Sequence, residues 1–438
     1  MTGPGAQTVL VLGGGPAGLS AAYALVQRGL RVTLLDRAAS LGGGFGDERQ
    51  PPPTLLGCHH ATWRLLTALE FPPRSPEFQQ TGLEFRLPDE RIVRYPHSRF
   101  PTPLHSLFTI GRFAGLSWSA RWRLLSWLEE LWEGSSELGT DLEYRTAQEW
   151  LTSLGHDVSL QQAIWNPLAQ WLTGNGLRML SADALAGALA PVFLRRSSDS
   201  RIMIPLRSPN VFFVEPILDR LRRSGADVRP ETQAMQLLYR QEHVTGVRLR
   251  DGTVLEADWY VSAVSYRHLT ALLPERWLTR FAYFQQISEL TPVPRGVVRL
   301  VARQVTQAPR LMLLREGPFQ RVQVHPKEDG QNLFTLITTD GQRRQADMGE
   351  QATQLLQATG LIRPSTEVSL IGNDEDADSV LSLAPGTKVR RPIQTSPIAN
   401  LLVAGSWTDT GWPANLESAI VSGERCASII SGTPLTAY

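Results

Sequence analysis

Three glycines and one aspartate near the start of the chain have the types and spacing needed to bind a phosphate-containing ligand. Gly13, Gly15 and Gly18 form a G-x-G-x-x-G pattern, and Asp36 ends the next apolar run. In such a pattern the first glycine permits a tight turn, the second lets a pyrophosphate approach the backbone, and the third allows close helix packing. A carboxylate like that of Asp36 can bind the hydroxyls of an adenosine ribose. The pattern predicts a dinucleotide site.

The elements around these residues occur in the order that such a site requires. Thr8–Leu12 is apolar and β-branched, residues 19–26 are apolar and alanine-rich, and Arg31–Leu35 is strand-like. The helix would begin at the glycines, so Pro16 and Ala17 belong to the predicted site, because free N–H groups and the helix dipole favour a phosphate there. A glycine turn between two core elements, without a ligand, is the alternative.

A second group of glycines narrows the choice of dinucleotide. Arg37 follows the aspartate, and Gly42, Gly43 and Gly44 come a few residues later. This order resembles the FAD-dependent amine oxidase and phytoene desaturase superfamily. The resemblance implies FAD as the cofactor, with the second glycine group close to its pyrophosphate and ribityl chain. It also implies an α/β fold with α+β insertions, in which a Rossmann-like FAD-binding domain accompanies a discontinuous substrate domain.

The C-terminal region contains a second candidate contact with the cofactor. Residues 400–404 form an apolar strand pattern, a glycine-rich turn follows, and we expect a helix to begin near Ala414 with Pro413 at its first turn. The N-terminus of that helix would stabilise the electron-rich edge of a reduced flavin. Residues 404–417 resemble the flavin-closing motif of the hydroxysqualene dehydroxylase family, A-G-D-W-T-D-T-G-x-P-A-x-x-E.

This resemblance assigns further residues to the cofactor. In the C-terminal turn and helix they are Gly405, Ser406, Trp412, Pro413, Ala414 and Leu416, with the Leu416 N–H at flavin O2. In the middle of the chain, the backbone of Val228 would contact the adenine. Two places depart from the family pattern: Ser406 replaces an aspartate, and residues 50–54 (QPPPT) replace a run that contains a histidine. His59 and His60 follow a few residues later.

The same resemblance implies a reaction, the reductive removal of the hydroxyl group of hydroxysqualene to give squalene. An acid must protonate the departing oxygen, and Asp409 is the candidate because it lies in the flavin-facing turn. Aspartate is also a common turn and cap residue, which is the alternative role. The sequence has no second G-x-G-x-x-G pattern for NADPH, so we expect an external electron donor or acceptor.

Two other functions remain open at this point. A carotenoid (phytoene-type) desaturase or isomerase would share the fold and the apolar tunnel, but a desaturase would move hydride in the opposite direction. A non-catalytic lipid-binding relative would retain the fold without the reaction. In both enzymatic interpretations the substrate is an apolar isoprenoid.

The composition excludes several classes of protein. The 438 residues have a net charge of +1, which gives no reason to expect nucleic-acid binding. Cys58 and Cys426, the two cysteines, lie far apart, so no metal site is predicted, and so few cysteines suit the cytoplasm. The sequence has no apolar stretch of about 18 residues, the length that spans a membrane.

Residues 100–132 are unusually rich in aromatic side chains. Trp118, Trp122, Trp127 and Trp132 alternate there with leucines and arginines. Such a segment suits the membrane interface, with arginines on phosphates; an ordinary core helix or the lining of a substrate tunnel are the alternatives. Peripheral contact with the inner membrane face is therefore included in our expectation of a cytoplasmic protein.

The order of these patterns predicts how the chain is divided. We expect the FAD-binding domain to comprise residues 1–60, 200–265 and 395–438, and the substrate domain residues 61–199 and 266–394. Within them we expect a helix over residues 55–69 and a strand or loop over residues 210–214.

Overall fold

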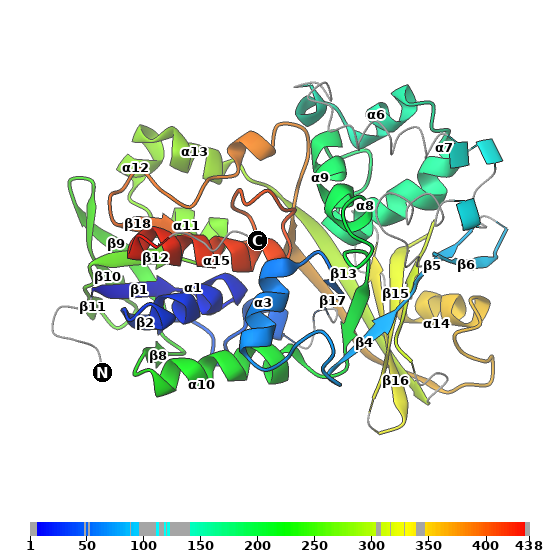
Figure 1. Ribbon diagram of the computed structural model, residues 1–438, viewed down its shortest axis with the longest axis horizontal. Helices are drawn as coiled ribbons and strands as arrows, with labels where there is room; N and C mark the ends of the chain where they lie inside the picture. The colour runs from blue at the N-terminus through cyan, green and yellow to red at the C-terminus, as the bar shows by residue number, and fades with distance from the viewer. Residues whose placement is uncertain are drawn as a thin grey trace.

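The computed structural model describes residues 7–47, 50, 53–87, 89–95, 111–113, 118–119, 121–122, 141–303, 308–315, 317–327, 329–338 and 347–433. Two large sheets organise these residues (Figure 1). The mixed α/β architecture confirms the fold class expected from the sequence. The predicted domain boundaries stay predictions.

The first sheet is parallel and lies at the left of Figure 1. Its strand order is β18-β12-β1-β2-β8. The strands are β1 (Thr8–Leu12), β2 (Arg31–Leu35), β8 (Asp227–Arg229), β12 (Trp259–Ser262) and β18 (Leu401–Val403). Because parallel strands need crossover connections, residues from three distant parts of the chain meet at one edge of this sheet.

Helices α1 (Pro16–Gln27) and α15 (Leu416–Ser431) pack against each other beside this sheet. A Cβ atom at Gly423 would lie 2.4 Å from the carbonyl oxygen of Ala17, so only glycine allows this approach. Helix α10 (Glu215–Arg223) also contacts α1. The apolar residues of these elements form one buried core.

The second sheet has seven strands in the order β17-β13-β16-β15-β14-β5-β6. Its pairs are antiparallel, except for the parallel pair of β14 with β5. The strands are β5 (Leu83–Arg86), β6 (Ile92–Arg94), β13 (Pro292–Arg303), β14 (Arg310–Leu313), β15 (Phe319–Pro326), β16 (Gln331–Thr338) and β17 (Val368–Leu381). Helix α14 (Met348–Ala358) packs against one face through a separate apolar core.

Two three-stranded sheets complete the strand content of the described residues. One contains β9 (Ala234–Arg240), β10 (His243–Leu249) and β11 (Val254–Leu255); the other contains β3 (Leu55–Leu56), β4 (Phe78–Thr81) and β7 (Ile202–Pro205). Short helices connect these sheets to the rest: α2 (Gly43–Gly46), α3 (His60–Ala68), α11 (Tyr266–Leu272), α12 (Glu275–Arg280), α13 (Ala282–Ser288) and the single turn η4 (Lys388–Arg390).

A group of helices lies above the seven-stranded sheet in Figure 1. Its members are η1 (Leu142–Tyr144), α6 (Ala147–Ser153), α7 (Val158–Leu160), η2 (Gln161–Trp165), α8 (Asn166–Thr173) and α9 (Ala182–Phe193). Helix α6 begins with the capping box of Thr146 and Glu149, in which each side chain bonds the other residue's backbone N–H.

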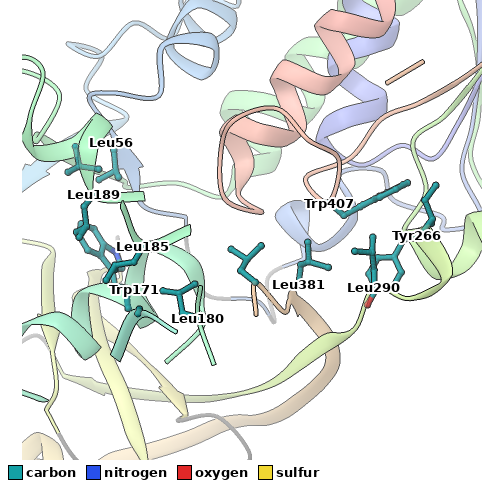
Figure 2. Close-up of a cluster of buried hydrophobic side chains, with 14 of the residues drawn as sticks. Leu56, Trp171, Leu180, Leu185, Leu189, Tyr266, Leu290, Leu381 and Trp407 are labelled. Atoms are coloured by element: carbon teal, nitrogen blue, oxygen red, sulfur yellow. The ribbon is translucent and has the colours of Figure 1, made fainter. Parts of the chain in front are cut away.

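The largest core joins the two halves of the molecule. Figure 2 shows its side chains, with Trp407 and Tyr266 at one end, Leu381 between, and Trp171 and Leu189 at the other. Trp407 belongs to the C-terminal turn, whereas Trp171 and Leu189 belong to α8 and α9. Trp407 therefore anchors the turn in this core, where its ring lies edge to face against Tyr266.

Three local expectations differ in detail from the structure. Residues 55–69 form the short strand β3 followed by helix α3, because Leu55 and Leu56 pair with β7. Residues 210–214 form η3 (Asn210–Val214), a π-helical turn that leads into α10. Helix α15 begins at Leu416 rather than near Ala414, because the Asn415 side chain accepts a hydrogen bond from the Ser418 N–H at 2.9 Å and caps the helix.

Candidate active site

The first glycine loop is closed against its neighbours except at one position. Gly13 has a φ of +101°, and a Cβ atom there would lie 2.8 Å from the carbonyl oxygen of Ala263. A Cβ atom at Gly18 would lie 1.8 Å from the carbonyl oxygen of Gly13. At Gly15, in contrast, a Cβ atom would meet nothing within 4 Å. The open space therefore lies at the glycine that the pattern assigns to the pyrophosphate.

The start of α1 faces this open space. Gly15 is the N-cap residue, and Pro16 and Ala17 begin the first turn. Pro16 has no N–H, and the N–H groups of Ala17 and Gly18 have no partner within the helix. These N–H groups and the helix dipole favour an anion at this end. The arrangement fits a phosphate-containing cofactor.

Asp36 lies at the end of β2 and holds the glycine loop in place. Its carboxylate accepts hydrogen bonds from the Gly14 N–H at 2.5 Å and from the Ala38 N–H at 2.7 Å. Val228, on the neighbouring strand β8, is in register with Leu34. The Arg37 guanidinium lies 2.6 Å from Nε2 of His268, so its side chain is directed toward α11.

The second glycine group lies directly against the first. The Gly42 N–H donates to the Gly14 carbonyl at 2.8 Å, and Gly43 is so close that a Cβ atom there would lie 3.3 Å from Cα of Gly15. At Gly44 a Cβ atom would meet nothing within 4 Å. The structure thus brings both predicted glycine groups to one surface.

The C-terminal turn comes to the same edge of the parallel sheet, after β18. The Gly405 N–H donates to the Ser422 hydroxyl at 2.8 Å, and a Cβ atom at Gly405 would lie 2.3 Å from the Trp407 ring nitrogen. The carbonyl of Ser406 accepts a hydrogen bond from the Ser418 hydroxyl at 3.1 Å. These hydrogen bonds connect the C-terminal turn to Ser418 and Ser422, which lie in the first eight residues of α15. Pro413 and Ala414 lie before the start of this helix.

Two arginines that the sequence analysis did not identify hold this turn. The Arg391 guanidinium donates to the carbonyl oxygens of Ser406, Trp407, Thr408 and Trp412 at 2.6 to 3.3 Å. Burial lowers its pKa to about 10, so the side chain remains charged at neutral pH. Arg425 donates to the carbonyls of Asp409 and Thr410, each at 3.1 Å. Guanidinium groups suit this task because they carry five donors in a fixed plane, but no local pattern shows which carbonyls they meet.

Asp409 has a structural role in the same turn. Its carboxylate accepts a hydrogen bond from the Gly411 N–H at 3.2 Å, two residues further on, and its own N–H donates to the Pro392 carbonyl at 2.8 Å. This is the turn-capping geometry of an aspartate. The turn-capping alternative therefore describes what the carboxylate does here, and the catalytic role of Asp409 stays a prediction.

His59, which follows the QPPPT segment, contacts the C-terminal turn. Its ring packs edge to face on Trp412, with 5.7 Å between ring centroids, and its Nδ1 accepts the Leu56 N–H at 3.3 Å. Burial lowers the pKa of His59, so at neutral pH the ring is uncharged and carries its proton on Nε2. His60, in contrast, is directed toward Asp199, at 3.4 Å.

Among the residues that the structure describes, no group of histidines, cysteines, aspartates or glutamates could hold a metal ion. Both cysteines are buried, and burial raises the pKa of each thiol, so neither is a ready nucleophile.

The aromatic segment 100–132 lies largely outside the described residues. Trp118 and Trp122 are within the described residues, and their exposed fractions are 71% and 65%.

A parallel sheet with two adjacent glycine loops, an aspartate after its second strand and a second helix N-terminus at one edge is typical of dinucleotide-binding oxidoreductases. Comparison with known proteins supports an oxidoreductase and identifies its family. The model of the flavin containing amine oxidoreductase family matches residues 16–431, and the chain belongs to this family. FAD is its cofactor.

Curated relatives and solved structures align over nearly the whole chain. A probable zeta-carotene desaturase of Synechococcus elongatus is 25% identical, covering 96% of this chain and 97% of its own. A 15-cis-phytoene desaturase of Glycine max is 24% identical, covering 96% and 79%. An oxidoreductase from Methanosarcina mazei superposes with a TM-score of 0.73 at 14% identity, covering 96% and 99%. Putrescine oxidase superposes with a TM-score of 0.70 at 16% identity, covering 97% and 98%.

Proposed function

We propose that this chain is a desaturase of a long isoprenoid. The observation that carries the proposal is the alignment, over 96% of the chain, with zeta-carotene and phytoene desaturases. The comparisons therefore favour the desaturase alternative over the dehydroxylation of hydroxysqualene that the C-terminal motif suggested first.

Desaturation removes a hydride and a proton from adjacent carbon atoms and leaves a double bond. Bound FAD would supply the two-electron acceptor, and an external acceptor would reoxidise it. Ten of the predicted cofactor-binding residues lie in the two glycine groups and around them: Gly13, Gly15, Pro16, Ala17, Gly18, Asp36, Arg37, Gly42, Gly43 and Gly44. The N-terminus of α15, with Leu416 at its start, would face the electron-rich edge of the flavin, as helix N-termini favour negative charge.

A small apolar pocket is compatible with an isoprenoid substrate. It lies where β5, α8 and α9 meet, and its volume is about 30 Å³, which admits only a small part of such a chain. Leu83, Tyr95, Trp171, Val192 and Phe193 form most of its apolar lining. Ligand pockets are lined mainly by apolar and aromatic side chains, and a hydrocarbon needs no polar partner.

Reductive dehydroxylation of hydroxysqualene is the second candidate. Residues 404–417 favour it, because this run resembles the flavin-closing motif of that family at most positions. The hydride would then move to the substrate, and an acid would have to protonate the departing hydroxyl group. Asp409 remains the candidate acid for that reaction.

The direction of hydride transfer separates the two reactions. Oxidised, FAD-loaded protein would be mixed anaerobically with phytoene or zeta-carotene in micelles, and dithionite-reduced protein with hydroxysqualene. Loss of oxidised-flavin absorbance together with a more unsaturated product would support the desaturase. Flavin reoxidation together with squalene would support the second candidate. Flavin-loaded protein that does neither would favour a non-catalytic lipid-binding relative.

We also propose that the protein contacts a membrane surface. Trp118 and Trp122 are exposed, and the Arg121 guanidinium lies over the Trp118 ring at 5.2 Å. Indole rings with an adjacent cation suit the interface between headgroups and acyl chains. In the part of the chain that the structure describes, no helix is long and apolar enough to cross a membrane.

A further inference from the structure

His59 is held between two elements that border the predicted flavin site. Its ring packs edge to face on Trp412 of the C-terminal turn, with 5.7 Å between the ring centroids. His59 is also the N-cap residue of α3, and the Ala61 N–H in the first turn of that helix donates to the Glu417 carboxylate at 2.8 Å. Glu417 follows Leu416, the first residue of α15. The imidazole therefore lies beside both the C-terminal turn and the helix start that the cofactor is expected to contact.

The hydrogen bonds of Leu56 determine which ring nitrogen of His59 carries the proton. The Leu56 N–H donates to Nδ1 at 3.3 Å, and the Leu56 carbonyl accepts the His59 N–H at 3.0 Å. Leu56 is itself held in place, because it pairs with Ile202 where β3 meets β7. Nδ1 is thus an acceptor, and burial lowers the pKa of the ring, so at neutral pH the imidazole is uncharged and its proton lies on Nε2. In this tautomer the free nitrogen of His59 is a hydrogen-bond donor and not a base.

The Nε2–H group of His59 has no acceptor in the part of the chain that the structure describes, although the side chain is only 5% exposed. Its neighbour His60 differs, because that Nε2 lies 3.4 Å from a carboxylate oxygen of Asp199. Nε2 of His59 also differs from both ring nitrogens of His325, which are sealed from solvent. Buried donors are nearly always paired. A donor that keeps some accessible surface beside a cofactor site is therefore expected to meet a ligand.

The acceptor oxygens of the elements beside His59 are largely occupied. Arg391 donates to four carbonyls of the C-terminal turn, and Arg425 donates to two more. The Glu417 carboxylate accepts three hydrogen bonds from the first turn of α3. The cofactor offers an acceptor, since the flavin ring has two carbonyl oxygens, whereas a hydrocarbon substrate offers none.

We propose that the Nε2–H group of His59 donates a hydrogen bond to a carbonyl oxygen of the bound flavin ring and stabilises the reduced cofactor relative to the oxidised one. Reduction adds electron density to the ring, and a hydrogen bond is stronger when its acceptor is more negative. A donor that is already held in place needs no rearrangement when this charge develops. The proposal rests on FAD alone and is independent of the substrate and of the direction of hydride transfer.

Two amide variants separate this hydrogen bond from the local structure of the chain. His59→Asn places its side-chain oxygen near the position of Nδ1 and can still accept the Leu56 N–H, but its amide does not reach the position of Nε2. His59→Gln reaches that position and keeps a donor there. The flavin-loaded proteins would be equilibrated with a reference dye of known potential, and the flavin carbonyl stretches would be recorded by infrared difference spectroscopy.

In His59→Asn we expect the ratio of reduced to oxidised flavin at a fixed potential to fall about tenfold, which lowers the midpoint potential of this two-electron couple by about 30 mV. One flavin carbonyl stretch should rise in frequency, because it loses a hydrogen bond. His59→Gln should stay within about threefold of the wild-type ratio. The control His325→Phe removes a buried imidazole from β15 in the other large sheet and should leave both readouts unchanged.

Flavin content and melting temperature report the folding of each variant. If His59→Asn does not retain flavin, His59→Phe, which keeps a ring against Trp412, is measured in its place. A wild-type potential and an unshifted carbonyl stretch in the variant without the donor would overturn the proposal. A fall in potential in His59→Gln as large as that in His59→Asn would overturn it as well, because the donor would then not be the cause.

Discussion

Thr62 donates both its backbone N–H and its hydroxyl group to one carboxylate oxygen of Glu417, at 2.9 and 2.6 Å. The other oxygen accepts the Ala61 N–H at 2.8 Å, and Glu417 is only 2% exposed. Ala61 and Thr62 lie in the first turn of α3, where free N–H groups and the helix dipole favour a negative charge. A single carboxylate thus fixes α3 to the start of α15, beside the predicted flavin edge.

Replacing Glu417 by alanine should destabilise the protein strongly. The substitution leaves three buried donors without an acceptor, and we expect the free energy of unfolding to fall by roughly 2–5 kcal/mol. Urea unfolding followed by circular dichroism would measure the loss. Glu417→Gln keeps one acceptor oxygen and should cost less. A comparable loss in the control Glu350→Ala, at an exposed position on α14, would contradict this role.

Replacing Gly15 by valine should abolish FAD binding without unfolding the protein. The backbone of Gly15 has a φ of −74°, which other residues adopt readily, and a Cβ atom there meets nothing within 4 Å. The added side chain would occupy the space assigned to the pyrophosphate. Flavin absorbance per mole of protein and the melting temperature of the apoprotein would be compared with those of Gly18→Ala. At Gly18 a Cβ atom would lie 1.8 Å from the Gly13 carbonyl oxygen, so this variant should fail to fold. Normal flavin content in Gly15→Val would remove the glycine loop from the cofactor site.

The sequence predicted the first glycine loop and its flanking strands because their signals are local. Gly13, Gly15 and Gly18 have a fixed spacing, and the apolar runs on either side have the length of strands. The sequence predicted neither the four-carbonyl contact of Arg391 nor the buried position of Glu417, since both depend on contacts between distant segments. The contact of His59 with Trp412 likewise joins two distant segments, and no short pattern contains it.

Short apolar runs explain the local errors. Val211 to Val214 is a continuous apolar stretch, and such a stretch fits a strand and a buried helix equally well. In the structure these residues form a π-helical turn, in which Phe212, Phe213 and Val214 pack in the buried core. At the start of α15, Pro413 is a good first-turn residue, but the Asn415 side chain provides the cap and moves the start of the helix to Leu416.

Stability should decline as the pH falls below about 6.5, partly because of His325. Burial lowers the pKa of His325 from 6.5 to about 4, and neither ring nitrogen has a hydrogen-bond partner. Between these values the unfolded chain binds a proton that the folded protein does not, so the free energy of unfolding falls by about 1.4 kcal/mol per pH unit. Burial lowers the pKa of His59 as well, which adds to the effect.

The substitution His325→Phe tests this origin of the pH dependence. It replaces two unpaired nitrogens by apolar atoms of similar shape and should be neutral or stabilising at neutral pH. Its loss of stability between neutral pH and about pH 5 should be roughly 2 kcal/mol smaller than that of the wild-type protein. Urea unfolding over this pH range would measure both slopes; identical slopes would mean that His325 does not stay unprotonated in the folded state.

Replacing Trp118 and Trp122 by serine should weaken binding to liposomes and leave the flavin content unchanged. Both indoles are exposed, at 71% and 65%, so their removal costs the folded protein little packing, whereas each buries apolar area when inserted at a membrane interface. Co-sedimentation with vesicles that contain anionic lipids would measure partitioning, with Trp118→Phe and Trp122→Phe as the variant that keeps aromatic rings. We expect the serine variant to lose about tenfold or more in partitioning, since removal of roughly 1.4 kcal/mol of apolar transfer energy already gives that factor. Arg121→Gln should weaken binding mainly at low salt, because the attraction between a cation and anionic headgroups is screened by ions. Equal partitioning of the serine variant and the wild-type protein would show that this segment does not contact the membrane, and these tryptophans would then require another exposed role.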